Sequence, residues 1–169
     1  MRIYVPCDAA ALAMGADAVA RAIERQIVER RIEAVVVRNG SRGMFWLEPL
    51  VEIETAQGRV AYGPVSPEAV DGLFNAGFLD GRKHDLYLGL TEEIPYLKRQ
   101  ERLTFARCGI TDPLSLSEYL SFGGYRGLQR ALTLKPKAIV EEVVRSGLRG
   151  HGGAGFPKVR YGIVSARLP

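Results

Sequence analysis

Glycine is concentrated in one short stretch near the end of the sequence, and this stretch is the strongest candidate for binding chemistry. Between Gly147 and Gly155, five of nine residues are glycine. Because glycine has no Cβ, its backbone accepts positive φ and its N–H groups can face a ligand closely. Arg149 adds a positive charge within the stretch. A loop of this composition can form a nest for phosphate oxygens.

The spacing Gly150-x-Gly152-x-x-Gly155 matches the glycine pattern of dinucleotide-binding sites, but its surroundings do not. That pattern needs a strand before it and a helix with a later acidic residue after it, whereas here a predicted helix comes first. No Lys-Ser or Lys-Thr pair completes a P-loop. The residues alone leave two interpretations open: a phosphate cradle and a mobile glycine hinge.

The cysteines and histidines are too few for a metal centre or a redox pair. Cys7 and Cys108 are the two cysteines, whereas an iron–sulfur cluster takes four ligands and thiol exchange takes a pair. We expect both to be structural thiols, and we expect no metal ligand and no catalytic side chain. His84 is expected in solvent, and His151, inside the glycine stretch, can hydrogen-bond a flavin or nucleotide phosphate.

The composition is typical of ordinary water-soluble domains. The 169 residues suffice for one domain, or for a small domain and part of a second, and 47% hydrophobic residues exclude general disorder. No apolar run approaches the roughly 20 residues of a membrane span, and Met1 to Val5 does not resemble a signal peptide. Because the net charge of +4 comes from interspersed residues, nucleic-acid binding is not predicted. The low cysteine content predicts a cytoplasmic protein.

The first half of the sequence alternates strand and helix patterns in the order of a thioredoxin-like domain, so we predict an α/β fold. Asp8 is the expected N-cap of the first helix. The apolar cluster from Met44 to Leu47 fits either core packing or a subunit contact. We place this domain at residues 1–80. In chain order we expect a strand at 2–5, a helix at 10–31, a strand buried on both faces at 34–37, hairpin strands at 50–54 and 59–63, and a helix at 66–76.

The second half is predicted as a linker followed by helices. Residues 81–102 are polar and contain Pro95, which is typical of a linker. We expect Leu103 to Phe105 to be extended. Ser115 and Glu118 have the spacing of a capping box, and the patterns at 125–132 and 136–146 predict helices. Residues 103–169 would form the second domain.

A series of motifs runs from Leu103 to Pro157: Arg107-Cys108-Gly109-Ile110-Thr111-Asp112-Pro113, Glu118-Tyr119, Gly123-Gly124-Tyr125-Arg126-Gly127-Leu128, Glu141-Glu142-Val143, Ser146-Gly147-Leu148-Arg149-Gly150 and Gly152-Gly153-Ala154-Gly155-Phe156-Pro157. In the order and spacing of these motifs the sequence resembles the flavin-binding subunit of NADH dehydrogenases, the family of respiratory complex I and its diaphorase relatives. The resemblance implies that 103–169 begin a complex I-type FMN-binding α/β domain, with Arg149 beside the phosphate and Phe156 lining the flavin–nicotinamide region. The implied cofactor-binding residues are Arg149, Gly150, His151, Gly152, Gly153, Ala154, Gly155 and Phe156.

Arg2 to Asp8 and Gly89 to Leu97 are similar to the β subunit of soluble, NAD-dependent, molybdenum-containing formate dehydrogenase. That resemblance implies an NADH:FMN oxidoreductase (diaphorase) subunit that passes electrons between iron–sulfur clusters, FMN and NAD. The implied partners are a molybdenum-carrying α subunit and an iron–sulfur γ subunit. The alternatives are a subunit of an NAD-linked hydrogenase or of complex I, and a non-catalytic docking module for partner subunits, formed by the thioredoxin-like domain at residues 1–80.

The sequence departs from this family in three places. After Pro157 the family has Thr-Gly-x-Lys-Trp, whose Lys helps hold FMN, and this sequence has Lys158-Val159-Arg160-Tyr161. His151 stands where the family usually has Arg. The Cys ligands of the 4Fe-4S cluster and the residues that complete the NAD pocket lie downstream in the family and are absent here. We therefore expect a truncated or frame-shifted gene, and no turnover by this chain alone.

Overall fold

The computed structural model describes residues 1–153 and 155–156. The chain divides into two compact units, Met1–Tyr119 and Leu120–Pro169. Ala154 and the divergent tail 157–169 lie outside the described residues. The extent of the second domain, predicted at residues 103–169, remains a prediction.

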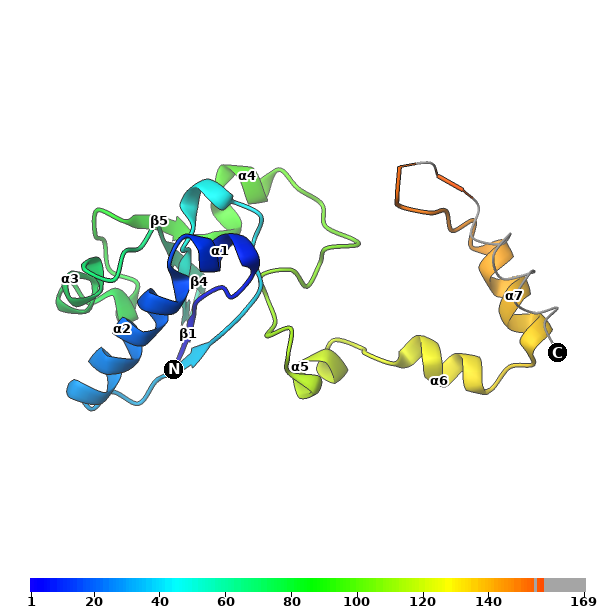
Figure 1. The fold of residues 1–169 in the computed structure, drawn as a ribbon, viewed down its shortest axis with the longest axis horizontal. Helices are drawn as coiled ribbons and strands as arrows, with labels where there is room; N and C mark the ends of the chain where they lie inside the picture. Colours follow the sequence, from blue (N-terminus) through cyan, green and yellow to red (C-terminus); the bar gives the residue numbers. More distant parts are fainter. Residues whose placement is uncertain (154, 157–169) are drawn as a thin grey trace. The chain divides into compact units, whose positions relative to one another are not determined.

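A five-stranded mixed sheet forms the centre of the first unit (Figure 1). β1 and β2 are parallel, and every other neighbouring pair is antiparallel. A parallel pair requires a crossover, which the helices α1 (Ala9–Ala13) and α2 (Ala16–Glu29) supply. This confirms the α/β, thioredoxin-like order of strand, helix, strand, hairpin and helix. The sheet order is β2-β1-β3-β4-β5, with β1 at Arg2–Tyr4, β2 at Val35–Val37, β3 at Val51–Thr55, β4 at Gly58–Tyr62 and β5 at Tyr87–Leu90.

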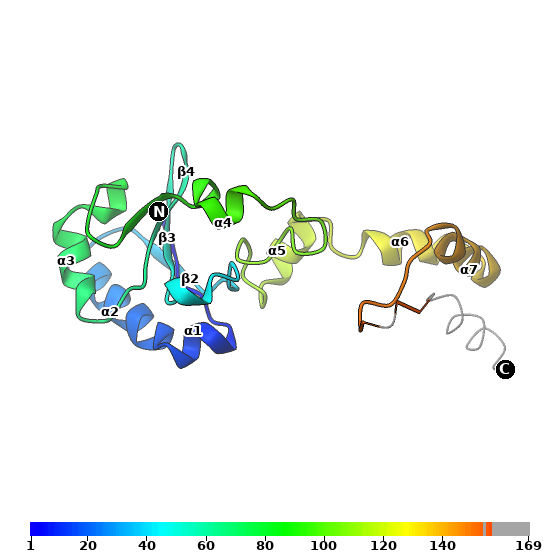
Figure 2. The same ribbon diagram turned by 90° about the horizontal axis from the view of Figure 1, so that it is seen from above.

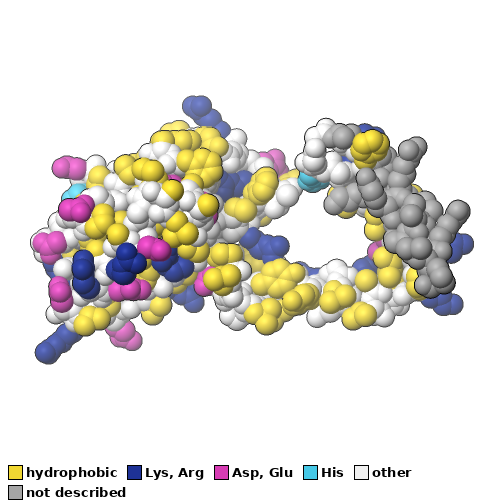
Figure 3. All heavy atoms as spheres, viewed as in Figure 1, with side chains coloured by type: hydrophobic (Ala, Val, Ile, Leu, Met, Phe, Trp, Pro, Cys, Tyr) yellow, Lys and Arg dark blue, Asp and Glu magenta, His cyan; other side chains and the backbone are white. Residues whose placement is uncertain are grey.

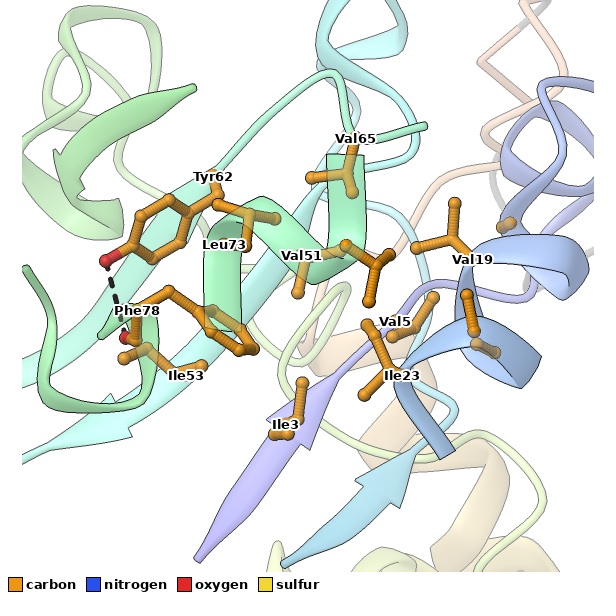
Figure 4. Packing of buried hydrophobic residues seen from close by; sticks show 14 of the residues in the cluster. Ile3, Val5, Val19, Ile23, Val51, Ile53, Tyr62, Val65, Leu73 and Phe78 are labelled. Carbon is orange, nitrogen blue, oxygen red and sulfur yellow. Dashed lines mark hydrogen bonds between the residues drawn. The ribbon is translucent and has the colours of Figure 1, made fainter. Parts of the chain in front are cut away.

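The main core lies on one face of this sheet, beneath α1, α2 and α3 (Ala69–Asn75). Side chains along a strand alternate between faces, so Val51 and Ile53 of β3 point into this core while Glu52 points away. Figure 4 shows Tyr62 beside Phe78, the first residue of the 3-10 turn η2 (Phe78–Asp80). The Tyr62 hydroxyl donates to the carbonyl oxygen of Arg82 at 2.7 Å.

A smaller apolar cluster lies on the opposite face. Met44 and Ala61 pack there with Ile94 and Leu97. These residues come from the sheet and from the neighbouring η1 (Phe45–Leu47), η3 (Thr91–Glu93) and α4 (Pro95–Lys98). Figure 2 shows α4 on the side of the sheet away from α2 and α3.

Several local predictions are confirmed. Asp8 caps α1, since its Oδ2 accepts from the Ala10 N–H at 3.1 Å. The hairpin forms with Thr55 opposite Gly58. Ser115 Oγ accepts from the Glu118 N–H at 3.2 Å, which is one of the two hydrogen bonds of a capping box. The carboxylate of Glu118 turns elsewhere, because its Oε2 accepts from the Asp112 N–H at 2.8 Å.

Four expectations differ from the structure. The predicted helix at 10–31 is two helices, because Gly15 takes a φ of +93° between them. The strand expected to be buried on both faces is an edge strand with Val35 63% exposed, because β2 pairs with β1 alone. The segment 81–102, predicted as a linker, holds β5 and α4, whose apolar side chains pack on the sheet. Leu103 to Phe105 forms a bend and turn in place of an extended segment.

The described part of the second unit contains two whole helices, α6 (Arg126–Leu132) and α7 (Pro136–Arg145), as the sequence predicts. The short helix α5 (Leu116–Ser121) spans the boundary between the units. Whether this region begins an FMN-binding α/β domain remains a prediction. None of the helices in 1–153 and 155–156 has both the length and the apolar character needed to cross a bilayer.

A charged cluster is buried against the sheet, and it was not predicted from the sequence. Glu52 on β3 is 1% exposed and accepts from Arg42 Nε at 2.8 Å and from Arg59 Nη1 at 3.0 Å. Arg42, 5% exposed, also donates to Glu92 Oε1 at 2.7 Å. The guanidinium of Arg59 lies over the ring of Tyr4, 3.3 Å from its centroid. One buried carboxylate therefore balances two arginines.

Removing this carboxylate should be costly. We expect Glu52→Ala to lower the free energy of unfolding by about 3–5 kcal/mol, because Arg42 is left buried without its main counter-charge. Glu54→Ala, two residues along β3 at an exposed position, is the control and should change it by less than about 0.5 kcal/mol. Urea unfolding followed by circular dichroism measures both. Equal losses in the two variants would contradict the assignment.

Glu48 gives a second, pH-dependent prediction. It is buried, and its carboxylate accepts from Ser41 Oγ at 2.8 Å and from the Leu50 N–H at 2.9 Å. Burial raises the pKa of Glu48 above its ordinary value of 4.5. The folded state then holds this proton more tightly than the unfolded state, so stability falls as pH rises above 4.5. Glu48→Gln cannot titrate, and its stability relative to the wild type should rise from about pH 4 to about pH 7. A difference that stays constant over this range, measured by urea unfolding, rejects the shift.

Candidate functional site

The glycine loop, residues 147–156, follows α7 directly. α7 ends at Arg145, and Gly147 then takes a φ of +64°, which only glycine adopts without strain. The Gly150 N–H donates to the Phe156 carbonyl oxygen at 2.7 Å. This bond brings the two ends of the stretch 150–156 together, so the described residues form a closed loop.

The backbone within this loop is open to a ligand. Gly153 has a φ of +94° and Gly155 a φ of +59°. A Cβ built at Gly152, Gly153 or Gly155 meets no described atom within 4 Å. The main chain is therefore accessible where a bulky anion would have to approach it. An accessible backbone is one requirement of the phosphate-binding nest that the sequence predicts.

The charged side chains beside the loop are exposed. Arg149 and His151 both face solvent and form no ion pair with any residue in 1–153 or 155–156. Phe156 is 56% exposed. Ala154, also predicted at this site, lies outside the described residues. The structure thus brings the other predicted site residues together in one exposed loop, and their role as ligands to FMN is still a prediction.

The cysteines do not form a second site. Cys7 is half-buried at the end of β1, where its Sγ donates to the Arg38 carbonyl oxygen at 3.6 Å. Cys108 is exposed. Within the described part of the chain, no group of three or more His, Cys, Asp or Glu side chains is placed to hold a metal ion. The residues present do not fit an iron–sulfur cluster, which needs four ligands.

Comparison with known proteins gives partial relatives. The chain is 48% identical over 68 residues, 40% of its length, to the NADP-reducing hydrogenase subunit HndC of Solidesulfovibrio fructosivorans. It is 54% identical over 43 residues to an NADH-quinone oxidoreductase subunit of Aquifex aeolicus, and 53% over 45 residues to that of Escherichia coli. These are 25% and 26% of this chain. The matches span 14% of the hydrogenase subunit and 10% of each of the other two relatives. No protein-family model matches the chain.

A solved structure also resembles part of the chain. It is a thioredoxin-like [2Fe-2S] ferredoxin from Aquifex aeolicus, with a TM-score of 0.44 and 17% sequence identity. The match covers 56% of this chain and 94% of the ferredoxin. At this level of similarity, neither the cluster nor the role of that ferredoxin transfers to this chain.

The two thiols should differ in reactivity. Burial raises the pKa of the Cys7 thiol above its ordinary value, and the thiolate is the reactive form. We expect Cys108 to react with iodoacetamide faster than Cys7 at about pH 8. The single-thiol variants Cys7→Ser and Cys108→Ser, followed by mass spectrometry, measure each rate separately. Faster labelling of Cys7 would mean that it is an activated thiol, contrary to our assignment.

Proposed function

We propose that this chain supplies the phosphate-binding loop for FMN in the diaphorase subunit of a multi-subunit, NAD-linked oxidoreductase. The similarity to subunits of an NADP-reducing hydrogenase and of NADH-quinone oxidoreductases supports that class of assembly. The observation that carries the proposal is the open glycine loop, with positive φ at Gly153 and Gly155 beside Arg149, which has no ion-pair partner among the described residues.

The loop fits the phosphate end of FMN. Backbone N–H groups that carry no side chain can approach phosphate oxygens closely. Arg149 adds charge-assisted hydrogen bonds, and His151 can donate one more. Phe156 offers an apolar ring that would shield part of the flavin from water. Bound FMN would supply hydride exchange with NAD and single-electron transfer to iron–sulfur centres.

The 169 residues contain two cysteines, too few for an iron–sulfur cluster, so the cluster ligands would be residues other than these. We favour a soluble, cytoplasmic, NAD-dependent formate dehydrogenase, because Arg2 to Asp8 and Gly89 to Leu97 are similar to its β subunit. Its molybdenum-carrying α subunit and iron–sulfur γ subunit would then be the partners. An NAD-linked hydrogenase is the alternative assembly, favoured by the 48% identity to the hydrogenase subunit.

A docking role is the second candidate function. Neither α6 nor α7 contains a buried residue. Figure 3 shows hydrophobic side chains along α6, where Leu128 and Leu132 are exposed. Apolar helix faces of this kind are typical of surfaces that a partner covers. Docking and flavin binding are compatible, because they use different residues of the second unit.

Flavin binding tests the main proposal. FMN is titrated into the purified chain, and its fluorescence anisotropy is followed. We expect saturable binding. Gly153→Ala should raise the Kd by about tenfold, because an L-residue at this positive φ costs about 1–2 kcal/mol.

Gly127→Ala is the matched control, because Gly127 lies outside the loop on α6, has no positive φ and has open space for a Cβ. It should leave the Kd nearly unchanged. Binding that does not saturate, or equal loss in both variants, would refute the assignment of the loop to the phosphate.

A further inference from the structure

A cavity of about 670 Å³ lies in the first unit, well separated in sequence from the glycine loop. All its lining residues fall between 8 and 108. Three aromatic rings contribute to its walls: Phe45 from η1, Tyr96 from α4, and Phe105 from the turn that follows. Its size falls within the range of about 300–1,000 Å³ that is usual for small-ligand sites.

The aromatic walls are exposed, and one of their rings packs against Trp46. Figure 3 shows hydrophobic side chains gathered over η1 and α4. Trp46 meets Tyr96 edge to face, with the ring centroids 5.0 Å apart. Phe45 is 60% exposed, and Phe105 faces solvent as well. Rings presented in this way offer stacking surfaces to a planar group.

Basic side chains outnumber acidic ones in the segment that borders this cavity. Residues 98–107 carry four basic side chains and one acidic side chain. Lys98 pairs with Glu93, but neither Arg99 nor Arg102 lies within ion-pair distance of a carboxylate in the described part of the chain.

Arg102 lines the cavity in a fixed position. Its Nε donates to Gln100 Oε1 at 3.0 Å, and its Nη2 donates to the Arg42 carbonyl oxygen at 2.9 Å. These bonds leave Nη1 without a hydrogen-bond partner among the described residues. A guanidinium held in this way is suited to an oxyanion.

We propose that this cavity binds a small ligand in which a planar aromatic ring carries one anionic group, the chemistry of a nucleoside monophosphate. The ring would stack among Phe45, Tyr96 and Phe105, and the phosphate would pair with Arg102. Asp8 and Glu101 also line the cavity, so a second phosphate group on the ligand is disfavoured. The proposal uses no residue of the flavin loop.

The chain carries its own reporter for this test. Trp46 is the single tryptophan, and its contact with Tyr96 couples its emission to the cavity. Three probes divide the ligand chemistry: AMP has ring and phosphate, adenosine has the ring alone, and ribose 5-phosphate has the phosphate alone. We expect AMP to bind saturably with 1:1 stoichiometry by calorimetry and to change the Trp46 emission. The other two probes should bind at least about tenfold more weakly.

Variants identify the residues. Arg102→Gln should weaken AMP binding by about tenfold, while Arg99→Gln, which removes a neighbouring charge outside the cavity, should not. Phe45→Ala removes an exposed ring without opening the core and should also weaken binding. Circular dichroism establishes that each variant is folded.

Absence of saturable AMP binding, equal affinity for the three probes, or equal effects of Arg102→Gln and Arg99→Gln would each overturn the proposal. If this surface instead binds a protein partner, no saturable AMP binding will be observed. The Gly153→Ala variant separates the two sites, since it should lose FMN affinity and keep AMP affinity.

Discussion

Glu52 carries a buried negative charge. The need to compensate this charge determines how the face of the sheet opposite the main core is built. A carboxylate taken out of water is tolerated only when donors surround it. Arg42 and Arg59 supply these donors, at 2.8 Å and 3.0 Å. Each guanidinium has donors beyond those that contact Glu52. Through these donors the ion pairs also fix the path of the chain from 102 to 112.

The segment 102–112 is held to the sheet by hydrogen bonds to its main chain. The carbonyl oxygen of Gly109 accepts from Asn39 Nδ2 at 2.7 Å and from Arg59 Nη1 at 3.0 Å. Only glycine suits this position: its φ is +76°, and a Cβ would lie 2.3 Å from Cδ of Arg42. Arg42 cannot easily yield, since Glu52 holds it. The geometry of an irregular segment therefore derives from a charge buried on a strand.

Local features of this fold could be predicted from the sequence, and non-local ones could not. The cap at Asp8, the hairpin turn and the helix starting at Pro136 depend on residues a few positions apart, so pattern rules find them. The edge position of β2 and the pairing of β5 depend on sheet order, which short-range patterns do not encode. The Glu52 cluster joins residues between 42 and 92 of the sequence. In the sequence, its charged residues are of the types usually found on a solvated surface. The alternation of β3 places Glu52 and Glu54 on the same face, so it does not distinguish the buried carboxylate from the exposed one.

The candidate flavin loop shows the same division between what composition specifies and what packing specifies. Its glycines could be found from composition alone, because positive φ is a property of single residues. The rigidity of the loop could not be predicted, because rigidity depends on the packing around the loop. The helix that leads into the loop, α7, contains no buried residue. A ligand bound by such a loop must also supply the order that the surrounding packing does not. Part of the interaction energy with phosphate is then used to fix the backbone, which lowers affinity. A surface that covered α6 and α7 would order the loop in advance, so partner docking and flavin binding would strengthen each other.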